Sequence, residues 1–345
     1  MRARLHLIGR SGSRSLLPWA FVSQIAFVFP GQGSQYVGMG QALAEASPAA
    51  AAVFRAADEA LGEELSRLSF EGPQEQLDLT VNAQPAILAT SIAYLRALAE
   101  SLDRELPAPA FYAGHSMGQY SALVSAGVLS LADGLRLVRE RGRQMQASAP
   151  DGAMAAIIGL SDDRVAELEA AGQALGVFTI ANRNSPGQIV VSGERVAVEG
   201  AAEKARELGA KRALVLMVSV AAHSPLMALA AERMRVTLAD VTFADPRAPL
   251  LANADARPLE TGEEARSELV DHLTRGVDWI AAVERMSAAG VTKFIEIGPG
   301  KVLTGLIKRI APDAEGYALD DQSAPGRISV PAFLDPTATA TGATA

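Results

Sequence analysis

The chain carries a serine between two glycines in Gly114 to Gly118, which reads Gly-His-Ser-Met-Gly. The apolar residues 108–114 before it predict a strand, and the apolar stretch through Val124 after it predicts a helix. Flanking glycines permit the tight strand-to-helix turn that exposes a nucleophilic serine at a helix N-terminus. An ordinary glycine-rich turn is the alternative, but the apolar segments on both sides favour the nucleophile. The chain is therefore expected to have an α/β fold with Ser116 at such a corner.

The length and composition of the chain suit an α/β fold. With 345 residues, 49% of them apolar, the chain can bury a large core, and 30 glycines suit short alternating elements. Residues 152–218 predict the order β-α-β-β-α-β, which is typical of a ferredoxin-like domain. We expect this small domain to be inserted into a larger α/β domain, residues 24–151 and 219–319. Residues 1–23 form an N-terminal extension, and residues 320–345 lack a core-forming pattern and are expected to be a disordered tail.

The hydrophobic pattern assigns elements to both domains. In the larger domain it predicts a strand at 25–29, followed by a tight turn, and helices at 42–60, 85–102 and 131–145. In the smaller domain it predicts strands at 154–160, 177–182, 188–193 and 213–218, and helices at 162–171 and 195–208.

Composition argues against several classes of protein. The net charge of -8 argues against a nucleic-acid-binding protein, because phosphate contacts need a surplus of Lys and Arg. The absence of cysteine excludes disulfides, thiol nucleophiles and thiolate metal sites, and the four histidines lack a zinc-binding spacing, so no metal is expected. The apolar patch at 16–22 is too short to span a bilayer, so we expect a cytoplasmic protein without a membrane contact. Residues 1–23 are rich in arginine and free of acidic residues, which makes an organelle transit peptide the alternative.

A serine hydroxyl needs a general base, and histidine is the usual one. His223 is the best candidate, because a Ser-Pro pair after it marks a helix start and leaves the histidine on the preceding loop. A helix-capping surface histidine is the alternative. His115 adjoins Ser116 on a turn where neighbouring side chains diverge, so a supporting role is expected. His272 fits an amphipathic helix and is expected to be structural, and His6 lies in the extension.

The turn at residues 31–35 reads Gly-Gln-Gly-Ser-Gln. It lacks the ending of a phosphate-binding Walker loop and the second half of a dinucleotide fingerprint. A contribution to an oxyanion hole is the functional interpretation, and a plain turn is the alternative.

Several motifs in a fixed order resemble one family. The chain is similar to the malonyl-CoA:acyl carrier protein transacylases of fatty-acid synthesis, and to the related acyltransferases of polyketide synthases, over residues 25–319. The resemblance implies a hydrolase-like α/β domain with an inserted ferredoxin-like domain. The motifs that carry it are residues 27–35 (FVFPGQGSQ), 84–86 (QPA), 114–118 (GHSMG), 141–142 (RG), 184–188 (NSPGQ), 223–227 (HSPLM) and 296–305 (EIGPGKVLTG).

The resemblance implies a role for each matching residue. Ser116 would be the acylated nucleophile and His223 its base. The backbone N–H groups of Gln32 and Met117 would form the oxyanion hole. Arg141 would pair with the free carboxylate of the malonyl group, because a guanidinium offers a carboxylate two parallel donors. The other substrate-binding residues implied are Gln84, His115 and Asn184.

The chain departs from the family pattern at three places. His272 stands where a glutamine is common, in a segment whose backbone carbonyl orients the base, so His272 is expected near the site. Residues 275–279 differ from the pattern usual there. Residues 220–223 match neither of the signatures for malonyl and methylmalonyl, so the choice of extender unit stays partly open.

The resemblance implies a malonyltransferase that uses malonyl-CoA and an acyl carrier protein and needs no cofactor. We expect a monomer. An acyl hydrolase that clears carrier proteins, or an acyltransferase for another extender unit, is the alternative. Arg141 argues against the hydrolase, because an enzyme for neutral acyl groups gains nothing from a buried cation. A generic esterase would add an acidic residue between serine and histidine, and a non-catalytic carrier-binding protein would not need Ser116 and His223.

Carrier proteins are usually acidic, so we expect a local basic docking surface despite the net negative charge. The first candidates are Lys204, Arg206, Lys211 and Arg212 of the small domain, and the alternative is a solvated helix face there, with docking near Lys301, Lys308 and Arg309.

Overall fold

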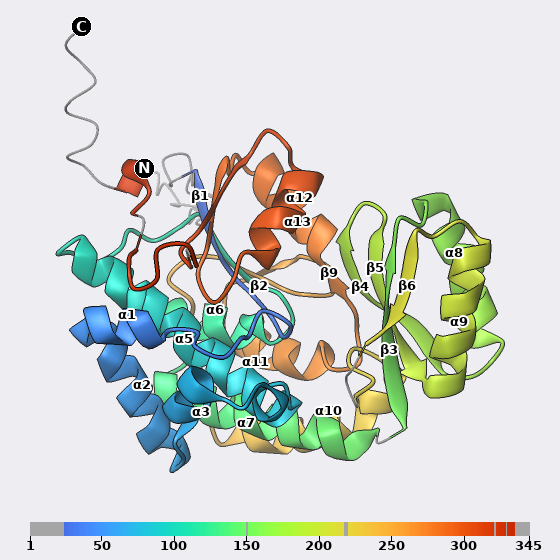
Figure 1. Cartoon of the computed structure of the whole chain (residues 1–345), viewed down its shortest axis with the longest axis horizontal. Coiled ribbons are helices and arrows are strands. Elements are labelled where there is room, and N and C mark those ends of the chain that lie inside the picture. The colour runs from blue at the N-terminus through green and yellow to red at the C-terminus, as the bar shows by residue number, and fades with distance from the viewer. Residues whose placement is uncertain (1–23, 150, 217–219, 321, 329, 335–345) are drawn as a thin grey trace, which may run out of the picture.

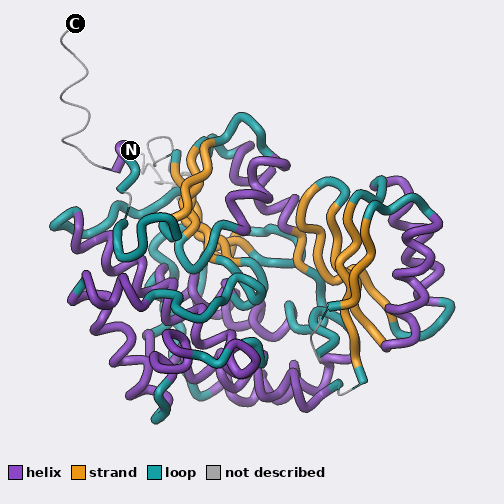
Figure 2. Tube along the Cα trace, in the orientation of Figure 1, coloured by secondary structure: helices purple, strands orange, loops and turns teal. Residues whose placement is uncertain are grey.

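Two β-sheets with helices packed against them make up the protein (Figure 1, Figure 2). The computed structural model describes residues 24–149, 151–216, 220–320, 322–328 and 330–334. The strands are β1 Ile25–Phe29, β2 Phe111–Gly114, β3 Gly152–Ile158, β4 Phe178–Ser185, β5 Gln188–Glu194, β6 Arg212–Val215, β7 Leu250–Leu251, β8 Pro258–Leu259, β9 Val277–Asp278, β10 Lys293–Glu296 and β11 Glu315–Ala318. The helices are α1 Gln41–Ala46, α2 Pro48–Leu61, α3 Leu65–Glu71, α4 Gln74–Leu77, α5 Thr80–Ser101, α6 Gly118–Ser125, α7 Leu131–Ser148, α8 Val165–Gln173, α9 Arg195–Glu207, α10 Ala228–Ala239, α11 Gly262–Asp271, α12 Trp279–Ala288 and α13 Val302–Ile310, with short 3-10 helices η1 Asp162–Arg164, η2 Pro225–Met227 and η3 Ala332–Leu334.

The larger sheet has the strand order β11-β10-β1-β2-β7-β8, with β1 near its centre. Its strands run parallel except for the antiparallel pair β7 and β8. Every residue of β1 is apolar and buried, as expected for a parallel strand covered on both faces. Ala26 and Val28 pack toward α12 and α13, whereas Phe27 and Phe29 pack toward α5 and α6 on the other face.

The smaller sheet lies beside the larger one, with α8 and α9 on its outer face (Figure 1). Its elements follow in the chain as β3-α8-β4-β5-α9-β6, and its strand order is β6-β3-β5-β4-β9, antiparallel among β3 to β6. The predicted fold class, α/β with a large and a small unit, is confirmed. The strand β9 comes from the larger part of the chain, yet it pairs in parallel with β4. The boundaries at residues 152 and 218 stay predictions, and Val218 lies outside the described residues.

Two predicted helices differ from those of the structure. The predicted helix at 42–60 is divided into α1 and α2, because Ser47 accepts a hydrogen bond from the Ala50 N–H and Pro48 starts the second helix. The predicted helix at 85–102 begins earlier, so Pro85 lies inside α5. Packing of α5 against α2 and α7 outweighs the preference of proline for a helix start.

The chain stays packed beyond the predicted end of the larger domain. Asp320 is buried, and its carboxylate accepts hydrogen bonds from the hydroxyls of Tyr36 and Tyr94, both at 2.8 Å, and from the Gly300 N–H at 2.7 Å. Leu334 is buried as well. The prediction of a disordered tail is therefore wrong at its start. The prediction relied on the lack of an apolar pattern, whereas the hydrogen bonds of Asp320 fix this part of the chain. The extension at 1–23 and the end at 335–345 lie outside the described residues.

The corner between β2 and α6 depends on two glycines. A Cβ at Gly114 would lie 2.1 Å from the backbone of Gly118, and one at Gly118 would lie 2.3 Å from the carbonyl oxygen of Phe29. The strands β1 and β2 thus approach helix α6 too closely for any side chain at these positions. Ser116 between them has a φ of 53°, in the left-handed region that side chains disfavour. Packing of the corner therefore holds the serine in this conformation.

We expect Gly118→Ala to lower the free energy of unfolding by about 2 kcal/mol or more, because its methyl group would push β1 away from α6. Gly305→Ala is the matched control, since Gly305 also lies in a helix, α13, and its added Cβ would meet no described atom within 4 Å beyond its chain neighbours and the backbone of its own helix. This control should be stabilised by about 1 kcal/mol, because alanine is the better helix former. Urea denaturation measures both, and equal stabilities would contradict the packing account.

Candidate active site

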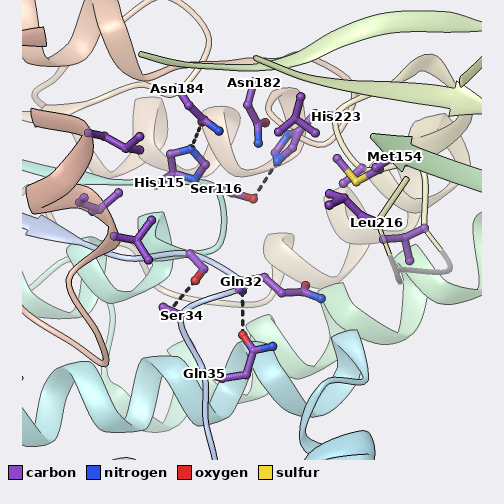
Figure 3. A pocket seen from close by; sticks show the side chains of 18 of the residues that line it. Gln32, Ser34, Gln35, His115, Ser116, Met154, Asn182, Asn184, Leu216 and His223 are labelled. Carbon is purple, nitrogen blue, oxygen red and sulfur yellow. Dashed lines mark hydrogen bonds between the residues drawn. The ribbon is translucent and has the colours of Figure 1, made fainter. Parts of the chain in front are cut away.

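The serine and the histidine predicted from the sequence face each other (Figure 3). Ser116 Oγ lies 2.7 Å from His223 Nε2, although the residues are 107 positions apart. His223 precedes η2 and also has a left-handed backbone, with a φ of 59°. Its Nδ1 lies 2.6 Å from the carbonyl oxygen of His272 and 3.1 Å from that of Arg275. A carbonyl can only accept, so Nδ1 carries the proton and Nε2 can accept the serine proton.

Burial keeps His223 neutral. The side chain is 2% exposed, and burial, followed by the positive charge of Arg141, lowers its pKa to about 3. Burial also lowers the pKa of His272 well below 6.5. Only a neutral imidazole can accept a proton, so His223 is in the state of a general base at neutral pH.

The backbone N–H groups of Gln32 and Met117 are the predicted donors to an oxyanion. Met117 precedes α6, and Gln32 lies on the turn after β1, which lines the same cavity as Ser116. Within the described part of the chain, neither N–H has a protein acceptor. The Gln32 side chain is directed elsewhere, with Nε2 3.2 Å from Thr80 Oγ1. The turn can approach the corner because a Cβ at Gly31 would lie 2.5 Å from the carbonyl oxygen of His115.

Arg141 is a buried cation beside the nucleophile. It lies on α7, is 1% exposed, and donates from Nη1 to Gln84 Oε1 at 2.8 Å and from Nη2 to Ser116 Oγ at 3.5 Å. Burial lowers its pKa to about 10, so it stays charged at neutral pH. Among the described residues, no carboxylate forms an ion pair with it. A buried cation without a counter-ion is costly, so this arrangement favours an anionic ligand next to Ser116.

A cavity of about 410 Å³ brings these residues together between the two sheets. The larger unit contributes the turn at residues 31–35, Ser116, His223 and Arg141. The smaller unit contributes apolar residues and the polar side chains of Asn182, Asn184 and Gln188. The remaining predicted residues lie in or behind its wall. His115 Nε2 is 2.9 Å from Asn184 Oδ1 on β4, and Gln84 lies buried behind Arg141. The further apolar lining residues are Met145, Met154, Val190, Leu216, Val220, Ala222, Val302, Leu303 and Leu306.

The His272 ring itself is buried and lacks a hydrogen-bond partner within the described residues. It packs edge-on against Tyr120, with ring centroids 6.5 Å apart, and against His223 at 5.9 Å. Its hydrogen bond to the candidate base comes from the backbone carbonyl. The structure therefore places the His272 side chain behind the site. A different side chain at this position would leave the backbone carbonyl available to His223.

Asn253 is a site residue that sequence reasoning missed. Its Oδ1 accepts a hydrogen bond from the backbone N–H of Ser116 at 2.8 Å. The residue follows β7, which is parallel to β2, so the carboxyl ends of both strands meet at one edge of the sheet. A polar residue after a strand is the available signal, but β7 has only two residues and gives no strand pattern.

Neither a metal centre nor a membrane span is found in the described part of the chain. The described residues hold no group of three or more His, Asp or Glu side chains that could bind a metal ion. None of the helices among them combines the length and apolar character that a membrane span requires.

A serine hydrogen-bonded to a neutral histidine is the pair of nucleophile and base that serine-dependent acyl transfer uses. The sequence profile of the acyl transferase domain matches residues 26–319. The malonyl CoA-acyl carrier protein transacylase of Escherichia coli K12 is 46% identical over 88% of this chain and 98% of its own, and the Bacillus subtilis 168 protein of that name is 45% identical over 87% and 94%. The chain belongs to this acyltransferase family.

Solved structures agree with this assignment. An acyl carrier protein S-malonyltransferase from Vibrio cholerae has a TM-score of 0.82 at 46% identity, covering 87% of this chain and 98% of that one. A malonyl-transacylase in complex with its type II PKS acyl-carrier protein has a TM-score of 0.82 at 42% identity, with coverage of 87% and 97%.

We expect the rate at which a fluorophosphonate labels Ser116 to stay nearly constant from about pH 8 down to about pH 5. The neutral form of His223 is the active one, so reactivity is lost only as the pH falls through its lowered pKa. Intact-protein mass spectrometry over time gives the labelling rate, with Ser116→Ala as the unlabelled control. A loss of rate centred at about pH 6.5 or above would show a base with an ordinary pKa.

Proposed function

We propose that this chain transfers a malonyl group from malonyl-CoA to the phosphopantetheine thiol of an acyl carrier protein, through an ester on Ser116. The observation that carries the proposal is Arg141, a buried guanidinium without an acidic partner among the described residues, 3.5 Å from Ser116 Oγ. A malonyl thioester has its reacting carbonyl close to its free carboxylate. The carbonyl could therefore meet Ser116 while the carboxylate pairs with Arg141. The names of the relatives support the same substrates.

The proposed reaction has two half-reactions that use the same groups. His223 Nε2 takes the proton of Ser116 while Oγ attacks the thioester carbonyl, and the N–H groups of Gln32 and Met117 stabilise the oxyanion. The oxyanion collapses, the C–S bond breaks, and the coenzyme A thiolate leaves with the proton from His223. The carrier thiol then gives its proton to His223 and attacks the seryl ester, and Ser116 recovers its proton as the thioester forms. These proton and acyl transfers require no cofactor.

Two related functions remain as alternatives. Attack of water on the seryl ester would make the enzyme an acyl hydrolase, but a site for neutral acyl groups gains nothing from the unpaired Arg141. The second alternative is transfer of another charged extender unit. Val220 and Ala222 line the cavity, and their small side chains leave room beside the acyl group. The pathway, fatty-acid or polyketide synthesis, the monomeric state and the cytoplasmic location stay predictions.

Incubation with equal amounts of malonyl-CoA and acetyl-CoA tests the proposal, with the acyl-enzyme weighed by mass spectrometry. We expect Arg141→Ala to lower the malonyl acylation rate by at least about tenfold, because charge-assisted hydrogen bonds contribute about 1.5 to 3 kcal/mol each. Acetylation should stay unchanged or improve, since acetyl has no carboxylate to pair. Arg141→Lys should restore malonylation only in part. A malonyl to acetyl ratio that is equal in wild type and Arg141→Ala would favour the neutral-acyl alternatives, and Ser116→Ala should form no adduct.

The carrier is proposed to dock at the edge strand β6. Of the four small-domain candidates, Lys204 pairs with Glu167 and Glu207, and Arg206 donates to a backbone carbonyl. Both lie on α9, on the outer face of the small sheet (Figure 1). The two candidates on or beside β6 are exposed, and the strand leads to Leu216, which lines the cavity. These two, Lys211 and Arg212, form the proposed docking site.

Charge reversal at the docking site, Lys211→Glu with Arg212→Glu, should raise the KM for the carrier about tenfold and leave self-acylation by malonyl-CoA unchanged. Lys204→Glu is the matched control on the same domain and should change neither, because Lys204 faces acidic partners already. Steady-state kinetics with varied carrier measures both. An unchanged KM would move docking to Lys301, Lys308 and Arg309 of the α13 region.

A further inference from the structure

A buried carboxyl group, Glu268 of α11, lies behind the nucleophile without lining the cavity. Its side chain is 1% exposed, and Oε1 accepts a hydrogen bond from the Asn253 N–H at 2.7 Å. Asn253 in turn accepts from the Ser116 N–H at 2.8 Å and donates to Gln119 Oε1 at 2.9 Å. Gln119 Nε2 donates to the Leu251 carbonyl at 3.1 Å. The side chain of Glu268 is thus two hydrogen bonds away from the backbone of the nucleophile.

The same helix also holds the base. His272 caps the C-terminus of α11, one turn after Glu268, and its N–H donates to the Glu268 carbonyl at 3.0 Å. The carbonyl of His272 then accepts from His223 Nδ1 at 2.6 Å. One rigid turn of helix therefore contacts the nucleophile through Asn253 and the base directly. A shift of α11 would change the distance between Ser116 and His223.

Burying the carboxyl group of Glu268 at this position carries a desolvation cost. Glu268 Oε2 has no hydrogen-bond partner among the described residues, and its ion pair with the partly exposed Arg257 is long, at 3.8 Å. Burial raises the pKa of Glu268 to about 7, against the opposing effect of the Asn253 N–H bond. An apolar side chain would avoid this desolvation cost if packing alone were required. The function that an apolar residue lacks is the acceptor for Asn253.

We propose that Glu268 is a positioning residue that fixes the Ser116 backbone through Asn253, and so sets the alignment of nucleophile and base. The inference rests on the proposed role of Ser116 as nucleophile. Either protonation state of the carboxyl group leaves Oε1 able to accept from Asn253. The required feature is an acceptor at this position, and a glutamine of the same size provides one.

The test compares Glu268→Ala, which removes the acceptor, with Glu268→Gln, which keeps it. We expect Glu268→Ala to lower kcat for malonyl transfer by at least about tenfold with KM changed by less than about twofold, and Glu268→Gln to stay within about threefold of wild type. Glu263→Ala, at an exposed position on the same helix that pairs with Arg266, is the matched control and should be silent. Equal rates for Glu268→Ala and the control, or a glutamine variant as slow as the alanine variant, would overturn the proposal.

A second readout separates this inference from the proposed function. Fluorophosphonate labelling of Ser116 needs the aligned pair but no malonyl group, so it should slow by the same factor in Glu268→Ala even if the natural substrate differs. The double variant with Asn253→Ala should be no slower than the slower single variant, because both act through one chain of contacts. Additive losses would show independent, merely structural effects. If Glu268→Ala does not fold, Glu268→Asp withdraws the acceptor by one methylene and takes its place.

Discussion

The hydrogen bond between Ser116 and His223 sets the requirements that the rest of the fold meets. It joins two residues with left-handed backbones, at φ values of 53° and 59°, a conformation that costs a residue with a side chain about 1–2 kcal/mol. Packing offsets this cost on both sides. Close contact of Gly114 and Gly118 with their neighbours holds the serine, and the carbonyl of His272 holds the imidazole. The alignment of the pair is thus a property of the whole scaffold.

Charge in the site is arranged around Arg141. Burial is the main cause that lowers the pKa of both His223 and His272, and the positive charge of Arg141 is the second. A carboxylate bound to Arg141 would cancel much of this positive charge and raise the pKa of His223 toward its ordinary value. The base would then become a stronger proton acceptor once a charged acyl group is in place. Selection of the acyl group would operate in the chemical step as well as in binding.

The sequence predicted those parts that a repeated local pattern encodes. The apolar run at 25–29 and the alternation in the small domain gave the elements, and the glycines around Ser116 gave the corner. Residues that act through one distant polar contact had no such pattern. Asn253 contacts a residue 137 positions away, and Asp320 contacts Tyr36 at a separation of 284. Helix periodicity likewise could not separate Arg141 from Arg139, although the structure pairs Arg139 with Glu63 at 2.7 Å and leaves Arg141 without an acidic partner among the described residues.

The pairing of β9 with β4 has a consequence for how such chains can evolve. The small sheet contains four strands from its own segment and a fifth, Val277–Asp278, from the surrounding part of the chain. Recombination at the ends of the inserted segment would carry four strands into a new host and leave the fifth behind. The segment is therefore not an exchangeable cassette. Because only Gly276 separates β9 from Arg275, whose carbonyl contacts the base, a foreign insert would also have to rebuild the support of His223.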